Sequence, residues 1–215
     1  KKTMLAPLLA ALLLTGCTTA PLDSLVHQVR QTRYALESAT YNGEDVAQSV
    51  ESKDWSKEPL WVVQQAAEQG VAHAQLDLGV RYRNGDGVPH DTMQTVAWYR
   101  KAAEQGYAKA QLYLGGMYDR GEGVPQDGQQ AVAWYRKAAE QGHAPAQFCL
   151  GIMYDVGRWV PQDYRQAYAW YSVSVANGGD FSSSRDSMAI SLNPTALAEA
   201  QALADRYFEQ YQPRS

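Results

Sequence analysis

Ala66-Ala67-Glu68-Gln69-Gly70 returns unchanged at residues 102–106 and at residues 138–142, with a constant period of 36 residues. A fixed period between about 20 and 50 residues is typical of stacked-repeat proteins. The period predicts an all-α fold, an α/α solenoid that winds as a right-handed superhelix of 36-residue helix-turn-helix repeats with diverged caps. Such a stack builds an extended surface, so it favours binding over catalysis.

Each repeat unit predicts two helices. In the middle unit, Ala110, Leu114 and Met117 recur with helical spacing, and Trp134 and Tyr135 lie on the apolar stripe of the second helix. A Trp-Tyr pair recurs at the same place in each complete unit, so core packing explains it better than a ligand-stacking site does. The three complete units are residues 71–106, 107–142 and 143–178.

The joints of each unit are equally regular. Gly121 stands where the first helix must end, a position that favours a left-handed residue. Asp127 then precedes the second helix, and Gln130 follows three residues later, which predicts an Asp-x-x-Gln variant of the capping box. Capping explains the recurring aspartates better than a row of metal ligands. The matching residues of the other units are Gly85 and Asp91, and Gly157 and Asp163.

This set of recurring positions resembles the Sel-1-like repeat, a relative of the tetratricopeptide repeat with a slightly longer unit. The resemblance is close from Ala110 to Gly142 and covers roughly half of the chain as full units. Trp159 departs from it, because Gly87 and Gly123 hold the matching loop position. Trp159 is expected either to pack the third unit against the C-terminal cap or to project from the rim as a binding anchor.

The flanks predict caps for the stack. Leu60–Gln69 reads as a second helix without a first one, and Asn193 before Pro194 predicts the start of a helix that ends near Tyr211. Leu22–Ser38 is a candidate helix. The stretch that follows it shows little apolar periodicity. The predicted parts are an N-terminal segment and linker at 17–56, the solenoid at 57–178 and capping helices at 179–211.

The first 16 residues predict a signal peptide. Lys1 and Lys2 precede a short apolar run, which is shorter than the roughly 20 residues that span a bilayer. The run closes on Leu-Thr-Gly-Cys, which resembles the bacterial lipobox and implies a lipid on Cys17; an ordinary signal peptide is the alternative. Because Thr18 rather than Asp follows, the resemblance implies an anchor in the outer membrane that faces the periplasm.

Composition and motifs narrow the function. The formal net charge of −4 offers no basic footprint for nucleic acid. A lipid on Cys17 would leave Cys149 as the other cysteine, so no disulfide framework is expected. No hydrolase elbow, zinc-binding His pair or phosphate loop occurs in the sequence. We therefore expect no catalytic residue, metal or cofactor, and a monomer.

The candidate binding surface follows from comparing the units with one another. Positions on the first helix that change between units while lying off the apolar stripe are free to recognise a partner, and first helices commonly line the concave side of a solenoid. Absence of any constraint is the alternative explanation for their variation. We call this set the ridge; it comprises Asp77, Val80 and Asn84, then Tyr113, Gly116 and Arg120, then Cys149, Ile152 and Val156.

These observations predict a non-enzymatic scaffold at the cell envelope whose partner is another protein. An alternative follows from the resemblance, because small secreted Sel-1-like lipoproteins resemble immunity proteins that neutralise antibacterial lipase effectors. A third reading, binding or hydrolysis of β-lactams, is implied by other Sel-1-like proteins that carry paired cysteines in each repeat. This chain lacks those pairs and the Ser-x-x-Lys motif, so the third reading is disfavoured.

Overall fold

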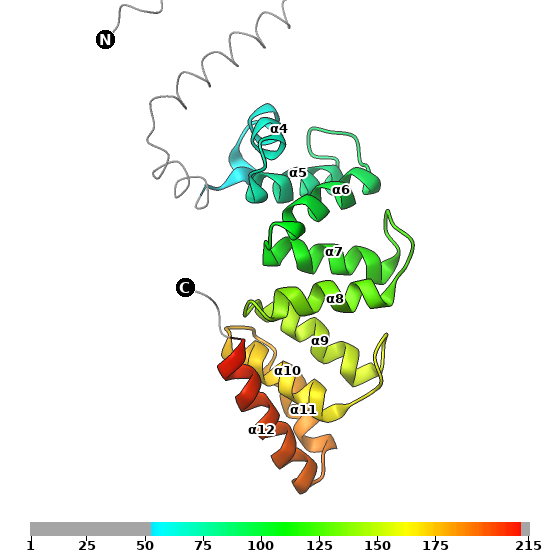
Figure 1. Cartoon of the computed structure of the whole chain (residues 1–215), viewed down its shortest axis with the longest axis vertical. Coiled ribbons are helices and arrows are strands. Elements are labelled where there is room, and N and C mark those ends of the chain that lie inside the picture. The colour runs from blue at the N-terminus through cyan, green and yellow to red at the C-terminus, as the bar shows by residue number, and fades with distance from the viewer. Residues whose placement is uncertain (1–52, 212–215) are drawn as a thin grey trace, which may run out of the picture. The chain divides into compact units, whose positions relative to one another are not determined.

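A computed structural model describes residues 53–211. Within that range all regular structure is helical, as predicted (Figure 1). The signal peptide, Cys17 and the candidate helix at 22–38 lie outside the described residues. The elements are η1 (Trp55–Lys57), α4 (Leu60–Glu68), α5 (Ala72–Asn84), α6 (Thr92–Glu104), α7 (Ala108–Arg120), α8 (Gly128–Ala139), α9 (Ala144–Val156), α10 (Tyr164–Ala176), α11 (Ser182–Ser191) and α12 (Pro194–Gln210).

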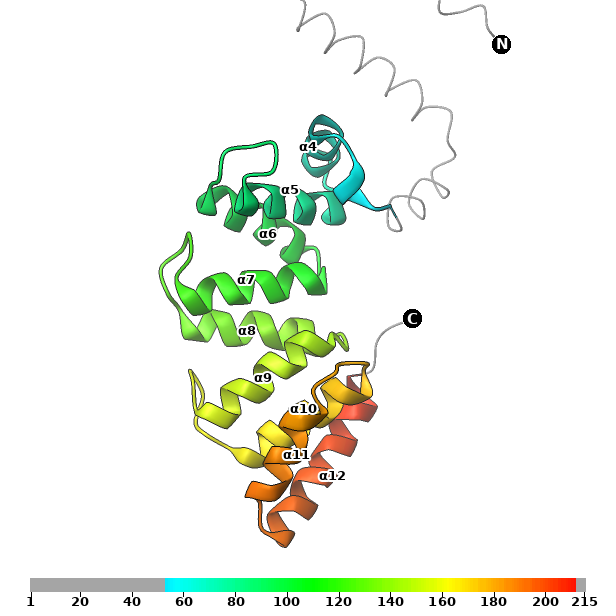
Figure 2. The ribbon, with the colours of Figure 1, turned by 180° about the vertical axis from the view of Figure 1, so that it is seen from behind.

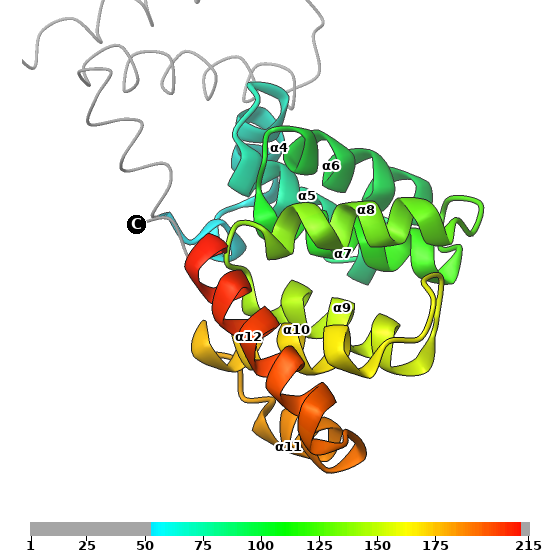
Figure 3. The same cartoon turned by 60° about the horizontal axis from the view of Figure 1, so that its bottom comes forward.

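The helices form a stack of antiparallel pairs. The elements named above all belong to one compact unit that begins at Asp54. From α4 to α10, each helix packs on the helices before and after it in the chain, and Figures 1 and 2 let the reader follow this order. Both α11 and α12 pack on α10, which Figure 3 shows from the C-terminal end. The predicted solenoid-like repeat fold is confirmed.

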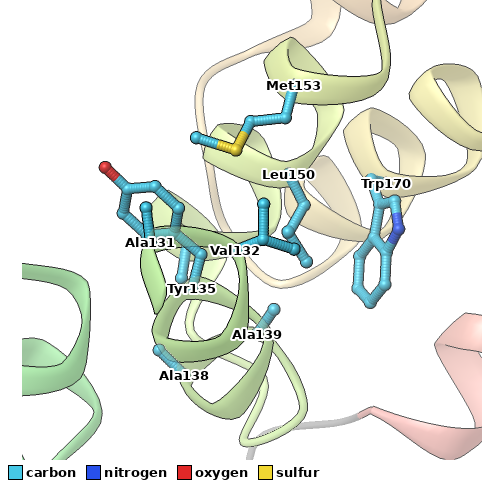
Figure 4. Packing of buried hydrophobic residues seen from close by; sticks show 9 residues of the cluster. Ala131, Val132, Tyr135, Ala138, Ala139, Leu150, Met153 and Trp170 are labelled. Carbon is cyan, nitrogen blue, oxygen red and sulfur yellow. The ribbon is translucent and has the colours of Figure 1, made fainter. Parts of the chain in front are cut away.

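Each pair is held together by a tyrosine ring that lies on a glycine. Tyr135 on α8 is buried, and a Cβ atom added to Gly115 on α7 would lie 2.8 Å from its ring. The glycine therefore lets the two helices approach closely around a large aromatic side chain. Figure 4 shows Tyr135 within the buried cluster that includes Leu150 and Met153 of α9. The same contact joins Tyr99 to Gly79 and Tyr171 to Gly151, where the corresponding distances are 2.6 and 2.5 Å.

Buried amides join each unit to the one before it. Gln111 lies at the start of α7, and its Nε2 donates to the carbonyl oxygen of Ala103 at 3.1 Å. Its Oε1 accepts a hydrogen bond from Gln141 at 2.8 Å, so every joint is bridged by two consecutive side-chain amides. The bridge adds a second hydrogen bond to a carbonyl at the end of the preceding helix, to which the Gly106 backbone N–H already donates. The same bridge recurs as Gln75 with Ala67 and Gln105, and as Gln147 with Ala139 and Asn177.

The predicted aspartate caps are confirmed, but only half of the predicted capping box forms. The carboxylate of Asp127 accepts from the backbone N–H of Gln130 at 3.0 Å. Its own backbone N–H donates to the carbonyl oxygen of Tyr118 at 3.0 Å, so a bond to α7 replaces the reciprocal bond to Gln130. Gly121 ends α7 with a φ of 69°, as the sequence predicted. Asp91 and Asp163 cap their helices in the same way.

The stack is closed differently at its two ends. At the start, the Arg81 guanidinium donates to three backbone carbonyls of the segment 55–58, where Trp55 is buried. Residues 55 and 56, counted as linker in the sequence, thus belong to the compact unit. At the other end, the Trp170 ring lies against Tyr207 and Tyr211 of the C-terminal cap, with centroids 4.5 and 5.5 Å away.

Two adjacent glycines test the tyrosine contact. Gly115→Ala should lower the free energy of unfolding by about 1–3 kcal/mol, because the new methyl group overlaps the Tyr135 ring. Gly116→Ala is the matched control, since its methyl group would meet the flexible end of Arg120 at 3.2 Å and the Tyr135 hydroxyl at an ordinary contact distance of 3.6 Å. It should add up to about 1 kcal/mol of helix propensity. Urea unfolding measures both, and equal effects would contradict the assigned contact.

Candidate functional site

The predicted ridge follows α5, α7 and α9, and its apolar character is greatest in the third unit. Ile152 is 38% exposed and Val156 is 59% exposed, and one helical turn separates them on α9. Val80 and Tyr113 are half-buried and pack against the core, with the Tyr113 ring 5.4 Å from that of Tyr99. The accessible apolar part of the ridge is therefore at α9.

The polar members of the ridge differ in their freedom to bind a partner. The Asp77 carboxylate pairs with Arg81 at 2.7 Å, and Arg81 in turn holds the start of the stack. The Asp77 side chain is therefore engaged within the fold, and its contact with a partner stays a prediction. Asn84 and Arg120 are exposed. Asn84 donates to Asp86 at 3.0 Å, and Arg120 forms an ion pair with Glu122 at 2.6 Å.

Trp159 packs toward the second unit, which corrects the expectation that it packs against the C-terminal cap. Its indole N–H donates to the Asp119 carboxylate at 2.6 Å, and Arg158 donates to the same oxygen at 2.9 Å. The indole ring covers Gly128, where a Cβ atom would overlap it. With 45% of its surface exposed, Trp159 also keeps a free part on the rim.

A reversal of residue sizes accompanies Trp159. In the preceding joint, Gly123 lies directly on the backbone of Thr92, and a Cβ atom at Gly123 would overlap the carbonyl group of Thr92. One period later, Gly128 replaces Thr92 and Trp159 replaces Gly123. A glycine on one side of the joint thus makes room for the larger residue on the other. Trp159 has a φ of 63°, a left-handed conformation that is strained for a large side chain and that its two contacts hold.

The partly buried titratable groups near the ridge give the site no nucleophile. Burial, followed by the negative charge of Asp119, raises the pKa of the Cys149 thiol to about 11, so the thiolate is scarce at neutral pH. Burial and then Lys109 lower the pKa of His143, whose Nδ1 has no hydrogen-bond partner. His143 therefore remains a neutral imidazole rather than a charged group.

Comparing the repeat units by sequence did not single out one variable position beside the ridge, that of residue 83. Residue 83 is Arg, whereas the matching residues 119 and 155 are both Asp. The signal was available, because a change of charge sign at a single repeated position is visible in the sequence. It was overlooked because the ridge was defined by positions 77, 80 and 84 and their equivalents.

Two further findings bear on the kind of site. Within residues 53–211 no group of three or more His, Cys, Asp or Glu side chains could hold a metal ion. In the same range no helix is both long and apolar enough to cross a membrane. The expectations of no metal, no cofactor and no catalysis stay predictions.

Comparisons with known proteins agree on the repeat. The Sel1 repeat family model matches residues 72–107, 108–143 and 144–178. A solved Sel1 repeat protein from Oxalobacter formigenes is 42% identical with a TM-score of 0.56, and the match covers 59% of this chain and 96% of that one. A protective antigen present in uropathogenic Escherichia coli strains, displaying an SLR fold, is 31% identical with a TM-score of 0.49 over 77% of this chain and 44% of that one.

More distant matches are less informative. An immunity protein from Pseudomonas aeruginosa is 21% identical with a TM-score of 0.34, and the match covers 79% of this chain and 81% of that one. At that level the likeness supports no inference about function. No match is found among curated proteins.

The size reversal at Trp159 is tested by a double-mutant cycle. Gly128→Ala should destabilise the protein by about 1–3 kcal/mol, because the new methyl group overlaps the indole ring. In a Trp159→Gly background the same change should be neutral or stabilising, since the overlap is gone and alanine favours the helix. Thermal and urea unfolding of the four proteins give the coupling energy, and simple additivity would exclude the contact.

Proposed function

The chain belongs to the Sel1 repeat family, and we propose that it is a non-enzymatic scaffold that binds another protein through the ridge of its first helices. A Sel1 repeat scaffold is suited to protein–protein interaction, because stacked repeats present a long continuous surface. The ridge is offered as that surface since the opposite side chains of the same helices are buried between the units.

The observation that carries the proposal is the exposure of apolar side chains on α9. Ile152 and Val156 stand where the second unit has Gly116 and Arg120. Neither the core nor a cap accounts for two branched apolar residues in water one helical turn apart. Exposed apolar groups on the variable face of a repeat are typical of a surface that a partner covers.

The same proposal places the protein at a membrane. A lipid on Cys17 would anchor it, and the residue after the cysteine favours the outer membrane and a periplasm-facing orientation. The stack would then be held near the membrane as a monomer. The immunity function inferred from the resemblance stays a prediction, because no feature of the described residues favours it over a general scaffold.

Site-specific photo-crosslinking in cells tests the ridge. A photoreactive residue at Val156 should crosslink to a discrete protein partner, whereas one at Ala133, which is exposed on a second helix, should not. A photoreactive residue at Ile152 should form an adduct with the same partner, and adding Val156→Glu should abolish this adduct. The melting temperature should not change, because Val156 is exposed. Equal crosslinking from Val156 and Ala133 would contradict the proposed surface.

The anchor is tested separately by Cys17→Ser. The variant should be recovered uncleaved or in the soluble fraction after cell fractionation, since neither lipidation nor lipobox processing can then occur. Wild-type protein should be recovered with outer membranes. A Cys17→Ser protein that is processed and membrane-bound like the wild type would exclude the lipoprotein proposal.

A further inference from the structure

The three buried tyrosines of the second helices meet different partners at the ends of the first helices. In the third unit the Tyr171 hydroxyl donates to the Asp155 carboxylate at 3.3 Å. In the second unit the matching residue is Asp119, and its charge adds to burial and Cys149 in raising the pKa of Tyr135. A carboxylate is therefore the usual neighbour of this phenol.

The first unit breaks that pattern. Tyr99 is fully buried, and its O–H donates to no acceptor in the described structure. Arg83 takes the place of the aspartate, and its guanidinium, as a donor to the phenol oxygen and as a positive charge, opposes the rise in the pKa of Tyr99 that burial causes. A guanidinium has only N–H donors, so it offers no acceptor to the phenol O–H. The phenol oxygen can accept from Arg83, but its O–H proton has no acceptor, and an unpaired buried donor is costly.

No nearby carboxylate of the described residues pairs with Arg83 or accepts from the Tyr99 hydroxyl. Glu122 is the carboxylate on which the charge of Arg83 acts, but Arg120 holds it with hydrogen bonds of 2.6 and 3.1 Å. Asp86 accepts from Asn84. Among residues 53–211 no carboxylate lies within ion-pair distance of Arg83, which is exposed.

We propose that Arg83 binds a carboxylate side chain of the protein partner, and that the Tyr99 hydroxyl donates to the same carboxylate once the Arg83 side chain swings outward. An arginine fork matches a carboxylate in both charge and geometry, and the phenol supplies a further donor. The inference rests on the proposed scaffold function and deepens it. Arg83 follows Val80 by three residues on α5, so it lies beside the ridge.

The chemistry of the fitting partner segment follows from the two ends of the ridge. The first unit offers an unpaired guanidinium, and the third unit offers the exposed side chains of Ile152 and Val156. A segment with an acidic residue at one end and apolar residues at the other complements both. A free small anion would satisfy the first unit alone.

Binding is tested with defined peptides. In a ¹⁵N titration, a blocked hexaglutamate peptide should shift the Arg83 Nε–H signal saturably, and a hexaglutamine peptide should not. Arg158, already bonded to Asp119, serves as the internal control and should not respond. Arg83→Gln should abolish saturable binding. Equal responses at both arginines would overturn the proposal, as would acetate or inorganic phosphate binding as tightly as the peptide.

Isosteric variants test the role of the phenol. Tyr99→Phe should weaken the binding of hexaglutamate roughly tenfold, because one hydrogen bond to a charged group is lost. It should not lower the melting temperature, since the hydroxyl donates to no acceptor in the free protein. Tyr171→Phe is the matched control and should lower the melting temperature by breaking the bond to Asp155. Equal destabilisation by both would show that the Tyr99 hydroxyl is already satisfied.

Arg83→Asp restores the residue type of the other two units. It should raise the melting temperature by giving the Tyr99 hydroxyl an acceptor, and it should abolish hexaglutamate binding. A variant that still binds the peptide would refute the assigned position. These results are independent of crosslinking at Val156, so failure of the carboxylate position and failure of the scaffold proposal are distinguishable.

Discussion

The packing of a tyrosine ring on a glycine is the contact on which the rest of the stack depends. A methyl group at Gly115 would lie 2.8 Å from the Tyr135 ring, and the other two units repeat the contact. The ring fixes how closely the two helices approach. It therefore also fixes the position of the phenol oxygen near the end of the first helix. The contact thereby couples the core to the ridge: Asp155 receives one phenol, whereas Arg83 stands beside another that no acceptor satisfies.

Once this contact and the amide bridges hold the helices, the remaining positions can diverge. The third unit shows two uses of that freedom. On its second helix, Val173 is buried where the other units have exposed lysines, because the C-terminal cap covers this face. On its first helix, Ile152 and Val156 are apolar although nothing described in the chain covers them. Burial explains the first divergence, and a protein partner is our proposal for the second.

Sequence reasoning predicted the features that recur in one unit and act within it: the helix pairs, the glycine ends and the aspartate caps. It did not predict side-chain contacts between residues that lie far apart in the chain. Gln111 reads as an ordinary polar residue until its bonds to Ala103 and to Gln141, 30 residues along the chain, are known. The packing alternative for Trp159 named the C-terminal cap as its neighbour, because the size reversal with Gly128 is visible only when two positions are compared at once. Asp77 looked free because its role is to hold Arg81, which donates to backbone carbonyls. Backbone carbonyls are the same in every residue, so the sequence gives no sign of this contact.

The central claim is that the ridge of the first helices, and not the face of the second helices, receives a protein partner. Amide hydrogen exchange of the stack, measured alone and with the partner identified by crosslinking, tests this most directly. We predict that the partner slows exchange in the last turns of α5, α7 and α9, which contain Arg83, Arg120 and Val156. Protection confined to α6 and α8, with the first helices unchanged, would contradict the account.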